Sequence, residues 1–556
     1  MRFVLPFLFF TLSFYLNAQH RAYLDIGNVR ALVNANGLLF QDTATNRARF
    51  EIPKGDSVHT ISLSTLWVTS IHQRNGFPHY SFGYDAYGYG HFDVQDLFKT
   101  GPVDVVHQKR DTSKKFQRLW KINKAEIDRH IQNWSSQNYQ ADSSILNWPG
   151  NGNANTAKTL APFEDLDGDS IYEPNSGEFP IIKGDQAIFL IINNFKNNST
   201  DTGYTYIRDP NQPWLVVDSF ASETFGYTQT EIHYMIYAYN SSQTHIANTV
   251  FMNLKLFNRS NKEEDDLKAF KFSILTEFTH RNNGLHFIGT DTAKQLYFGY
   301  NSGLVPDSTG APQTYRAQGM KLLSNSLTQT MQIPINNGTV PVFELPIRVA
   351  NFQKNIWHNG RRLRSGGNGF NTCIDTSTTP VFMFPGDLTA PRDSSHWSEF
   401  YPCYKDSSIK NAPDIKRIIG TPNVSSHFNH STNLELDYAY VFAQDTGGVV
   451  ASIAALQVSA DSVQAFYDRE RIVGISENKI ESQLDFTIYP NPANESISIK
   501  TDLFNFEVEI IDLKGQTIQR LKNSKNIDVS PLNQGVYFVR IRNESSIGVR
   551  RLVIAK

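Results

Sequence analysis

The sequence predicts a mainly β protein, built as one large β-sandwich or two fused sandwiches with a few decorating helices and a small immunoglobulin-like β-sandwich at the C-terminal end. The first observation is composition, because the 556 residues include 38 Phe and 24 Tyr, and aromatic residues favour strands. The second is the alternation of apolar and polar residues along many short runs, which is typical of half-buried strands. Long runs with helical spacing are rare, so we expect helices only as additions to sheets.

In the body of the chain, strands are expected where short apolar runs are bounded by turn residues. A strand pair is expected at 434–444 and 449–457, and helices are expected at 113–129 and 461–471, where apolar residues recur at helical spacing. The other strands expected in the body are 22–26, 29–33, 37–40, 49–52, 59–68, 188–192, 215–217, 231–239, 247–257, 270–276 and 295–300.

The C-terminal segment 487–556 shows the clearest alternation. Apolar Val508 and Ile510 alternate with two glutamates, and the turn sequence 512–515 separates this run from the next. Further turn residues at 533–535 and 545–548 separate the later runs. These features predict a small antiparallel β-sandwich.

The N-terminal residues 1–19 are expected to be a secretory signal peptide. Arg2 supplies the positive charge, residues 3–16 are largely apolar, and residues 16–19 offer a cleavage zone. The apolar run of about fourteen residues is shorter than the roughly 20 that a membrane-spanning helix needs. We therefore expect no transmembrane segment after the signal is removed.

The length of the chain and its net charge limit the possible domain organisation and partners. We expect a β-rich exported body at 20–475, with a candidate internal boundary near residue 185, then a polar linker at 476–486 and the C-terminal domain at 487–556. The formal net charge is -2, so the chain as a whole carries no excess of positive charge that would favour a nucleic-acid partner.

An acidic run predicts a calcium site. Asp165, Asp167 and Asp169 occupy alternate positions of a tight turn, so their carboxylates converge, and Ca²⁺ prefers six to eight oxygen ligands. The backbone carbonyl of Ile171 and the carboxylate of Glu173 would add further oxygens. Export favours this interpretation, because extracellular calcium can fill sites with dissociation constants of about 10⁻⁴ to 10⁻³ M. The alternative is a solvated acidic turn that binds no metal.

The run departs from an EF-hand loop at two positions. Position six holds Ser170 in place of glycine, and position twelve is Ser176, so the bidentate glutamate is missing unless Glu178 or Asp185 reaches the turn.

The two cysteines of the chain, Cys373 and Cys403, are expected to form a disulfide bond. An exported protein meets an oxidising environment, and a bond that closes about 30 residues contributes on the order of 3 kcal/mol by the chain-entropy estimate. The alternative is a pair of separate thiols.

Catalytic motifs are weak. His427 and His430 have the spacing of a metal pair, but they lack the glutamate of H-E-x-x-H and lie among Ser and Asn residues. The sequence contains no G-x-S-x-G nucleophile elbow and no phosphate-binding P-loop. Paired carboxylates of a glycoside hydrolase leave no sequence signature, because the fold sets their separation.

Residues 487–556 resemble the type A sorting domain of the type IX secretion system of Bacteroidota. The resemblance is carried by Tyr489-Pro490-Asn491-Pro492, the turn 512–516, the run 532–541 and the basic-apolar strand 550–556. It implies recognition by the secretion machinery, removal of the domain, and attachment to surface lipopolysaccharide or release.

The body resembles a family of large exported Bacteroidota proteins that are known only as sorting-domain-containing proteins. The resemblance is carried by residues 25–31, 96–102, 161–165 with 179–186, 357–360 and 382–387. It implies a β-rich body and names no catalytic residue.

These observations predict a secreted or cell-surface protein that reaches the outside through the periplasm. We expect a non-catalytic adhesive, binding or structural protein with a polysaccharide or protein ligand. Its Tyr- and Gly-rich residues 80–91 are either a loop that presents aromatic rings or a packed Ω-like loop. The alternative is an exported hydrolase of polysaccharide or protein.

Overall fold

The computed structural model describes the chain as two compact units, Met1–Tyr467 and Asp468–Lys556. The described residues are 20–56, 58–72, 78–82, 98–195, 203–208, 216–222, 228–263, 266–279, 286–301, 314–333, 351–357, 360–366, 369, 380–386, 397–399, 415–430, 432–473, 486–501, 506–512, 517–542 and 547–556. The predicted signal peptide, both cysteines, nearly all of the linker and most of the Tyr- and Gly-rich segment lie outside them.

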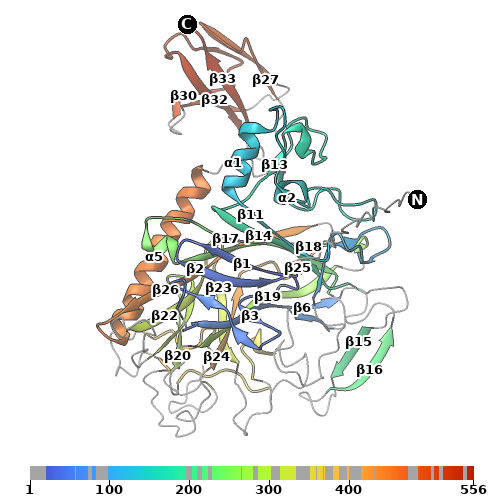
Figure 1. Cartoon of the computed structure of the whole chain (residues 1–556), viewed down its shortest axis with the longest axis vertical. Coiled ribbons are helices and arrows are strands. Elements are labelled where there is room, and N and C mark those ends of the chain that lie inside the picture. The colour runs from blue at the N-terminus through green and yellow to red at the C-terminus, as the bar shows by residue number, and fades with distance from the viewer. Residues whose placement is uncertain are drawn as a thin grey trace, which may run out of the picture. The chain divides into compact units, whose positions relative to one another are not determined.

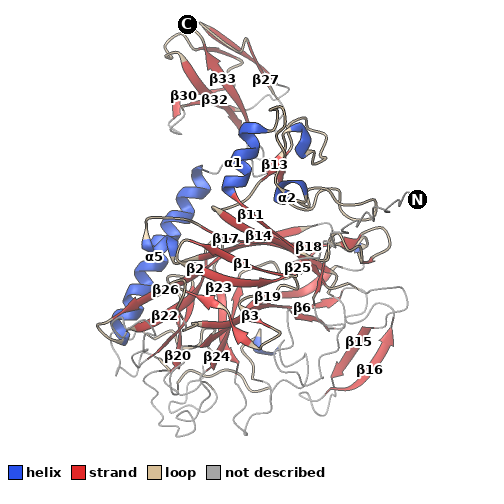
Figure 2. Cartoon of the chain, viewed as in Figure 1, coloured by secondary structure: helices blue, strands red, loops and turns tan. Residues whose placement is uncertain are grey.

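Strands dominate both units, which confirms the predicted fold class (Figures 1 and 2). The larger sheet of the first unit has nine strands. In spatial order its path runs β11 (Leu119–Asn123), β14 (Gln186–Asn193), β17 (Thr230–Ala238), β18 (Val250–Asn258), β26 (Asn433–Asp445), β22 (Tyr315–Leu322), β21 (Leu296–Asn301) and β20 (His286–Asp291), and β8 (Lys99–Thr100) pairs with β14.

The second sheet of this unit has six strands. Its path runs β23 (Leu327–Ile333), β24 (Ile415–Pro422), β19 (Leu267–Thr279), β6 (Ile61–His72) and β7 (Pro78–Phe82), and β25 (His427–Phe428) pairs with β19. The candidate boundary near residue 185 falls inside the first unit, because strands from both sides of it share each large sheet.

The two sheets form a sandwich around one core. Along β17, Ile232, Tyr234 and Ile236 point into the core between the sheets, whereas Met235 and Tyr237 belong to a second apolar cluster on the outer face of the larger sheet. This alternation follows from the two-residue period of a strand. The larger sheet is therefore buried on both faces.

A long helix, α5 (Val449–Val473), covers part of that outer face (Figure 1). The strand predicted at 449–457 is wrong, because Ile453, Leu456, Ala460 and Val463 recur every three or four residues and pack on one side into the second cluster. The helix predicted at 461–471 is the C-terminal half of α5. By length and composition only, residues 449–471 are long and apolar enough to cross a membrane.

The helix predicted at 113–129 begins later than expected. Residues 119–123 form β11, in which Trp120 and Ile122 face the outer cluster and Leu119 faces the sandwich core. The helix α1 (Lys124–Asn133) follows directly. Glu126 fixes its start, because its carboxylate accepts the backbone N–H of Asn123 at 2.7 Å.

Short elements complete the first unit. Other helices of the described residues include α2 (Ser143–Leu146), α3 (Thr244–Ala247) and the 3₁₀ turn η1 (Pro174–Ser176). The remaining strands are β1 (Arg21–Ile26), β2 (Val29–Asn34), β3 (Gln41–Asp42), β4 (Arg47–Ala48), β5 (Phe50–Glu51), β9 (Val103–Asp104), β10 (Lys109–Arg110), β12 (Phe163–Glu164), β13 (Phe179–Pro180), β15 (Gly203–Arg208) and β16 (Val216–Ser222).

The second unit is a small antiparallel sandwich, as predicted. One sheet contains β27 (Thr487–Tyr489), β28 (Ser496–Lys500) and β31 (Asn526–Asp528). The other contains β30 (Thr517–Lys522), β29 (Glu507–Ile511), β32 (Gly535–Arg542) and β33 (Ile547–Ile554). Val508, Ile510, Val539 and Leu552 fill a core of its own, and the alternating Glu509 lies opposite Arg540 on the other face.

Candidate functional site

The acidic motif lies in a closed loop on the outer side of the larger sheet. We call residues 165–178 the acidic loop. The chain enters the loop from β12 and leaves it through β13, and these two short strands pair antiparallel, so they bring the ends of the loop together. Tyr172 anchors its middle, because its hydroxyl donates to the carbonyl of Ile145 at 2.9 Å in the buried outer cluster.

Aspartate side chains hold the turn in shape. Asp165 accepts backbone N–H groups from Gly168 at 2.8 Å and from Ser170 at 2.9 Å, one on each carboxylate oxygen. Asp169 accepts the N–H of Ile171 at 2.7 Å. Gly168 and Ser170 both have positive φ, at 84° and 63°, so the chain folds back on itself within a few residues.

Glu178 closes the base of the loop. Its side chain is buried, and its two carboxylate oxygens accept the backbone N–H groups of Leu166 at 3.0 Å and of Glu173 at 2.6 Å. Of the two residues that sequence reasoning offered for the missing ligand, Glu178 reaches the turn. Asp185 instead accepts the backbone N–H of Asn240 at 2.8 Å.

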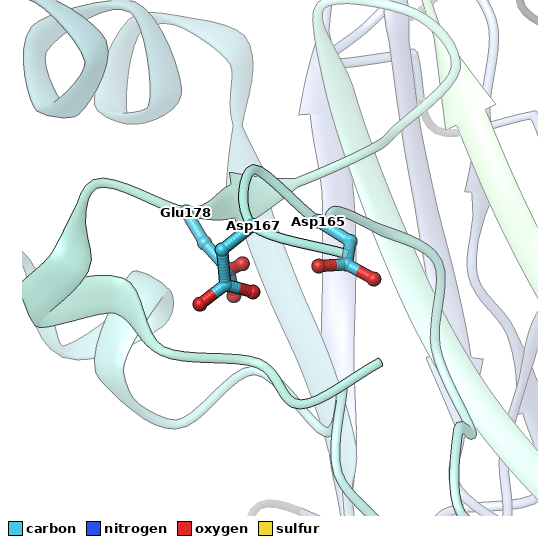
Figure 3. Close-up of side chains that lie close together, drawn as sticks. All are labelled: Asp165, Asp167 and Glu178. Carbon is cyan, nitrogen blue, oxygen red and sulfur yellow. The ribbon is translucent and has the colours of Figure 1, made fainter. Parts of the chain in front are cut away.

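The loop brings carboxylates together in two overlapping groups. Asp165, Asp167 and Glu178 form the first (Figure 3), and Asp167, Asp169 and Glu173 form the second. Within each group the oxygen atoms that would bind a metal lie within 4.8 Å of one another. The first group combines a buried, a half-buried and an exposed side chain, whereas all three side chains of the second are exposed.

The surroundings of the Glu178 carboxylate differ from those of the other buried glutamates. Among the described residues, six glutamates are buried. Five of them pair with a basic side chain: Glu51 with Arg30, Glu231 with Arg259, Glu277 with Arg417, Glu399 with Lys416, and Glu509 with Arg520 and Arg540. No basic side chain of the described residues lies within ion-pair distance of Glu178, although burial of an unpaired charge is costly.

A buried histidine contacts the C-terminal end of the acidic loop. His130 on α1 contacts the backbone carbonyl of Glu178 through Nε2 at 3.1 Å. Burial lowers the pKa of His130, so its neutral form is favoured and Nε2 can donate to that carbonyl. Residues 178 and 130 are 48 positions apart in the chain, so no local sequence pattern indicates this contact.

The candidate histidine pair does not share a partner. His430 lies against the carboxylate of Asp266, with Nδ1 at 2.9 Å from Oδ1, whereas His427 contacts the hydroxyl of Ser426 at 3.2 Å. Each histidine therefore has its own local hydrogen-bonding group.

Residues 487–555 match the family of secretion system C-terminal sorting domains. The protein is therefore exported by the type IX secretion system. This match confirms the sorting domain predicted from the sequence and implies that the protein is secreted or displayed on the cell surface. It also implies that the second unit interacts with the secretion machinery.

No curated protein matches the chain. Among solved structures, it is similar to a polysaccharide lyase at 6% identity with a TM-score of 0.17, over 65% of this chain and 40% of that one. The exported protein thus spans less than half of that lyase, and a likeness of this size carries no argument.

Proposed function

We propose that this exported protein is a non-catalytic binding or scaffold protein of the cell exterior, and that its acidic loop holds a structural Ca²⁺ ion. The observation that carries the proposal is the buried, unpaired carboxylate of Glu178 beside Asp165 and Asp167. A bound cation would supply the positive charge that basic side chains supply to the other buried glutamates.

The oxygen set suits a hard cation. Asp165, Asp167 and Glu178 offer carboxylate oxygens at the base of the loop, and Asp169 and Glu173 offer more at its exposed side. The carbonyl of Ile171 remains a candidate ligand. Because these groups come from one loop closed by β12 and β13, the ion would link the ends of an irregular segment that lacks long strands.

The described carboxyl groups with displaced pKa favour a non-catalytic protein. Burial raises the pKa of Glu277 to about 7, a value that suits a general acid. However, Glu277 lies inside the six-stranded sheet, where it pairs with Arg417 and accepts from Ser62. A glycoside hydrolase needs a second carboxylate about 5 to 9 Å away across an open cleft. Because Glu277 lies inside a sheet and pairs with Arg417, we rank a hydrolase second, after a non-catalytic protein.

The calcium site is tested by calorimetric titration of the EDTA-treated full chain with Ca²⁺. We expect saturable binding with a dissociation constant of about 10⁻⁴ to 10⁻³ M or tighter, and a melting temperature that rises with Ca²⁺ because the ion binds the native state. The variants Asp167→Ala and Glu178→Gln should lose both effects.

The matched control for this titration is Glu263→Gln, which removes an exposed carboxylate elsewhere. It should bind Ca²⁺ as the unchanged protein does. Heat that persists in Asp167→Ala and Glu178→Gln would place the ion elsewhere, and no heat in any protein would reduce the acidic loop to a solvated turn.

We further propose that the exported body stays attached to surface lipopolysaccharide after the sorting domain has acted. The matched sorting domain supports this proposal. Surface proteins would be released by mild protease and probed with an antibody to the body and one to lipopolysaccharide. A body that runs at its polypeptide mass, without lipopolysaccharide, would contradict attachment.

A further inference from the structure

The segment that carries the acidic loop also exposes apolar side chains. Of thirteen large apolar residues that are exposed in the described chain, six lie between positions 131 and 181. These are Ile131, Trp134, Leu146, Leu166, Ile171 and Ile181. Exposed apolar side chains scattered singly need no explanation, whereas a concentration of them marks an interaction surface.

Two of these residues, Leu166 and Ile171, belong to the acidic loop, and Trp134 contacts it. We call these three residues, together with Ile131, the apolar patch. The ring of Trp134 lies against Gly177, where an added Cβ would approach Trp134 Cε2 to 2.6 Å. Ile131 lies on α1, three positions before Trp134, which is the C-cap residue of that helix and keeps helical backbone angles, so both lie on one side of the helix end.

Leu166 and Ile171 extend the patch over the loop itself. The N–H of Leu166 donates to Glu178, the neighbour of Gly177, and Ile171 lies in the same turn. Their side chains are 56% and 48% exposed. Apolar side chains that packed inside the loop would be buried. These two are exposed, so a partner can contact them.

Charge restricts the chemistry of that partner. Residues 124–185 contain ten acidic and four basic residues, a formal charge of -6 against -2 for the whole chain. Asp167, Asp169 and Glu173 are exposed beside the apolar patch and have no basic side chain within ion-pair distance among the described residues. Even one bound Ca²⁺ would leave this segment negative.

We propose that the apolar patch and the carboxylates around it dock a protein segment that is both apolar and basic. The proposal deepens the binding role proposed above and rests on it. Leucine- or isoleucine-like side chains would cover Trp134 and Leu166, and lysine or arginine would face Asp167, Asp169 and Glu173. An anionic polysaccharide or lipid would instead meet like charge.

The test uses the full chain and fluorescein-labelled synthetic peptides, read by fluorescence anisotropy at about 0.15 M salt, where surface charges are screened beyond about 8 Å. The probe alternates leucine and lysine, and the matched probe alternates leucine and glutamate. We expect the lysine probe to bind at least tenfold more tightly. Each titration is run in Ca²⁺ and in EDTA, so failure of metal binding and failure of docking give separate readings.

Variants locate the binding surface. Trp134→Ala combined with Leu166→Ser should weaken the lysine probe at least tenfold, because a central aromatic residue dominates such surfaces. Val458→Ser is the matched control, since Val458 is 55% exposed on α5, and it should leave affinity unchanged. Unchanged melting curves verify that both variants fold.

Three outcomes overturn the proposal. They are equal binding of the glutamate probe, unchanged affinity in the Trp134 and Leu166 variant, and binding of phosphatidylglycerol vesicles by a protein that ignores the lysine probe. The last outcome assigns the surface to an anionic lipid.

Discussion

Glu231 shows how a single buried charge is stabilised in the larger sheet. Its carboxylate accepts from Arg259 at 2.7 Å, from His233 at 2.9 Å and from the backbone N–H of Val103 at 2.6 Å. Burial alone raises the pKa of Glu231, but the charge of Arg259 and the hydrogen bonds outweigh burial and lower the pKa to about 2. The native state therefore stabilises the ionised form.

This arrangement predicts a loss of stability in acid. The pKa of Glu231 falls from 4.5 to about 2 on folding, so its contribution is complete above pH 4.5 and is lost as the pH falls from 4.5 towards 2. The contribution is on the order of 3 kcal/mol. Urea unfolding of the unchanged protein and of Glu231→Gln at pH 7, 4.5 and 2.5 measures it.

The variant should be less stable at pH 7 and should lose less stability than the unchanged protein between pH 4.5 and 2.5. The amide that replaces the carboxylate in this variant does not titrate, so equal losses in the two proteins would show that other groups govern the acid transition.

At the residue scale, the sequence predicted the local part of the acidic loop, named Glu178 only as one of two alternatives with Asp185, and did not indicate the contact with His130. Asp165, Asp167 and Asp169 lie within five positions, so the turn itself brings Asp167 close to each of the other two. Glu178 enters through the pairing of β12 with β13, and His130 enters through the packing of α1. Neither contact has a periodic signal in the sequence, because each depends on which elements meet in the fold.

The helix α5 shows the same distinction at the scale of an element. Val449 and Val450 favour a strand by local propensity, and this misled the interpretation of 449–457. When a longer stretch is considered, the apolar spacing across 453–467 favours a helix. Two polar side chains of this helix also form hydrogen bonds with the larger sheet: Gln457 donates to Asp291 at 2.8 Å and Tyr467 donates to Asp437 at 2.8 Å. A longer window would have identified the helix, since helices are longer than strands.

The packing of α5 predicts a clear difference between two of its residues. Leu456 is fully buried against the larger sheet, so Leu456→Ala should destabilise the first unit by about 2 to 5 kcal/mol. Val458 is exposed, so Val458→Ala should change the free energy of unfolding by less than about 0.5 kcal/mol. Urea unfolding followed by circular dichroism measures both.

Similar costs for Leu456→Ala and Val458→Ala would contradict this packing. That result would also weaken the interpretation of residues 449–471 as a core helix and favour their role as an independent apolar helix.

At the scale of the whole molecule, the mainly β class and the small C-terminal sandwich followed from alternation and composition. The assignment of strands to two sheets did not, because β6 pairs with β19 and β18 with β26 across about 200 residues of sequence. Many strands share a similar apolar pattern and compete for the same partners, so a short stretch of sequence does not indicate which strands will pair.

The two compact units should unfold separately. Each has its own apolar core, and the chain passes from the first unit to the second only once. Calorimetry of the full chain should therefore show two transitions, with an enthalpy of about 50 kcal/mol for the roughly 70-residue sorting domain and several times more for the body.

Two buried residues assign those transitions. Val539→Ala opens a cavity in the sorting domain and should lower the midpoint of the smaller transition alone, whereas Leu254→Ala lies in the sandwich core and should lower that of the larger transition alone. Because cooperativity extends only as far as contiguous packing, a variant in one core reports on the other only if the cores are coupled. A single transition that shifts in both variants would show that the exported body and its sorting domain fold as one cooperative structure.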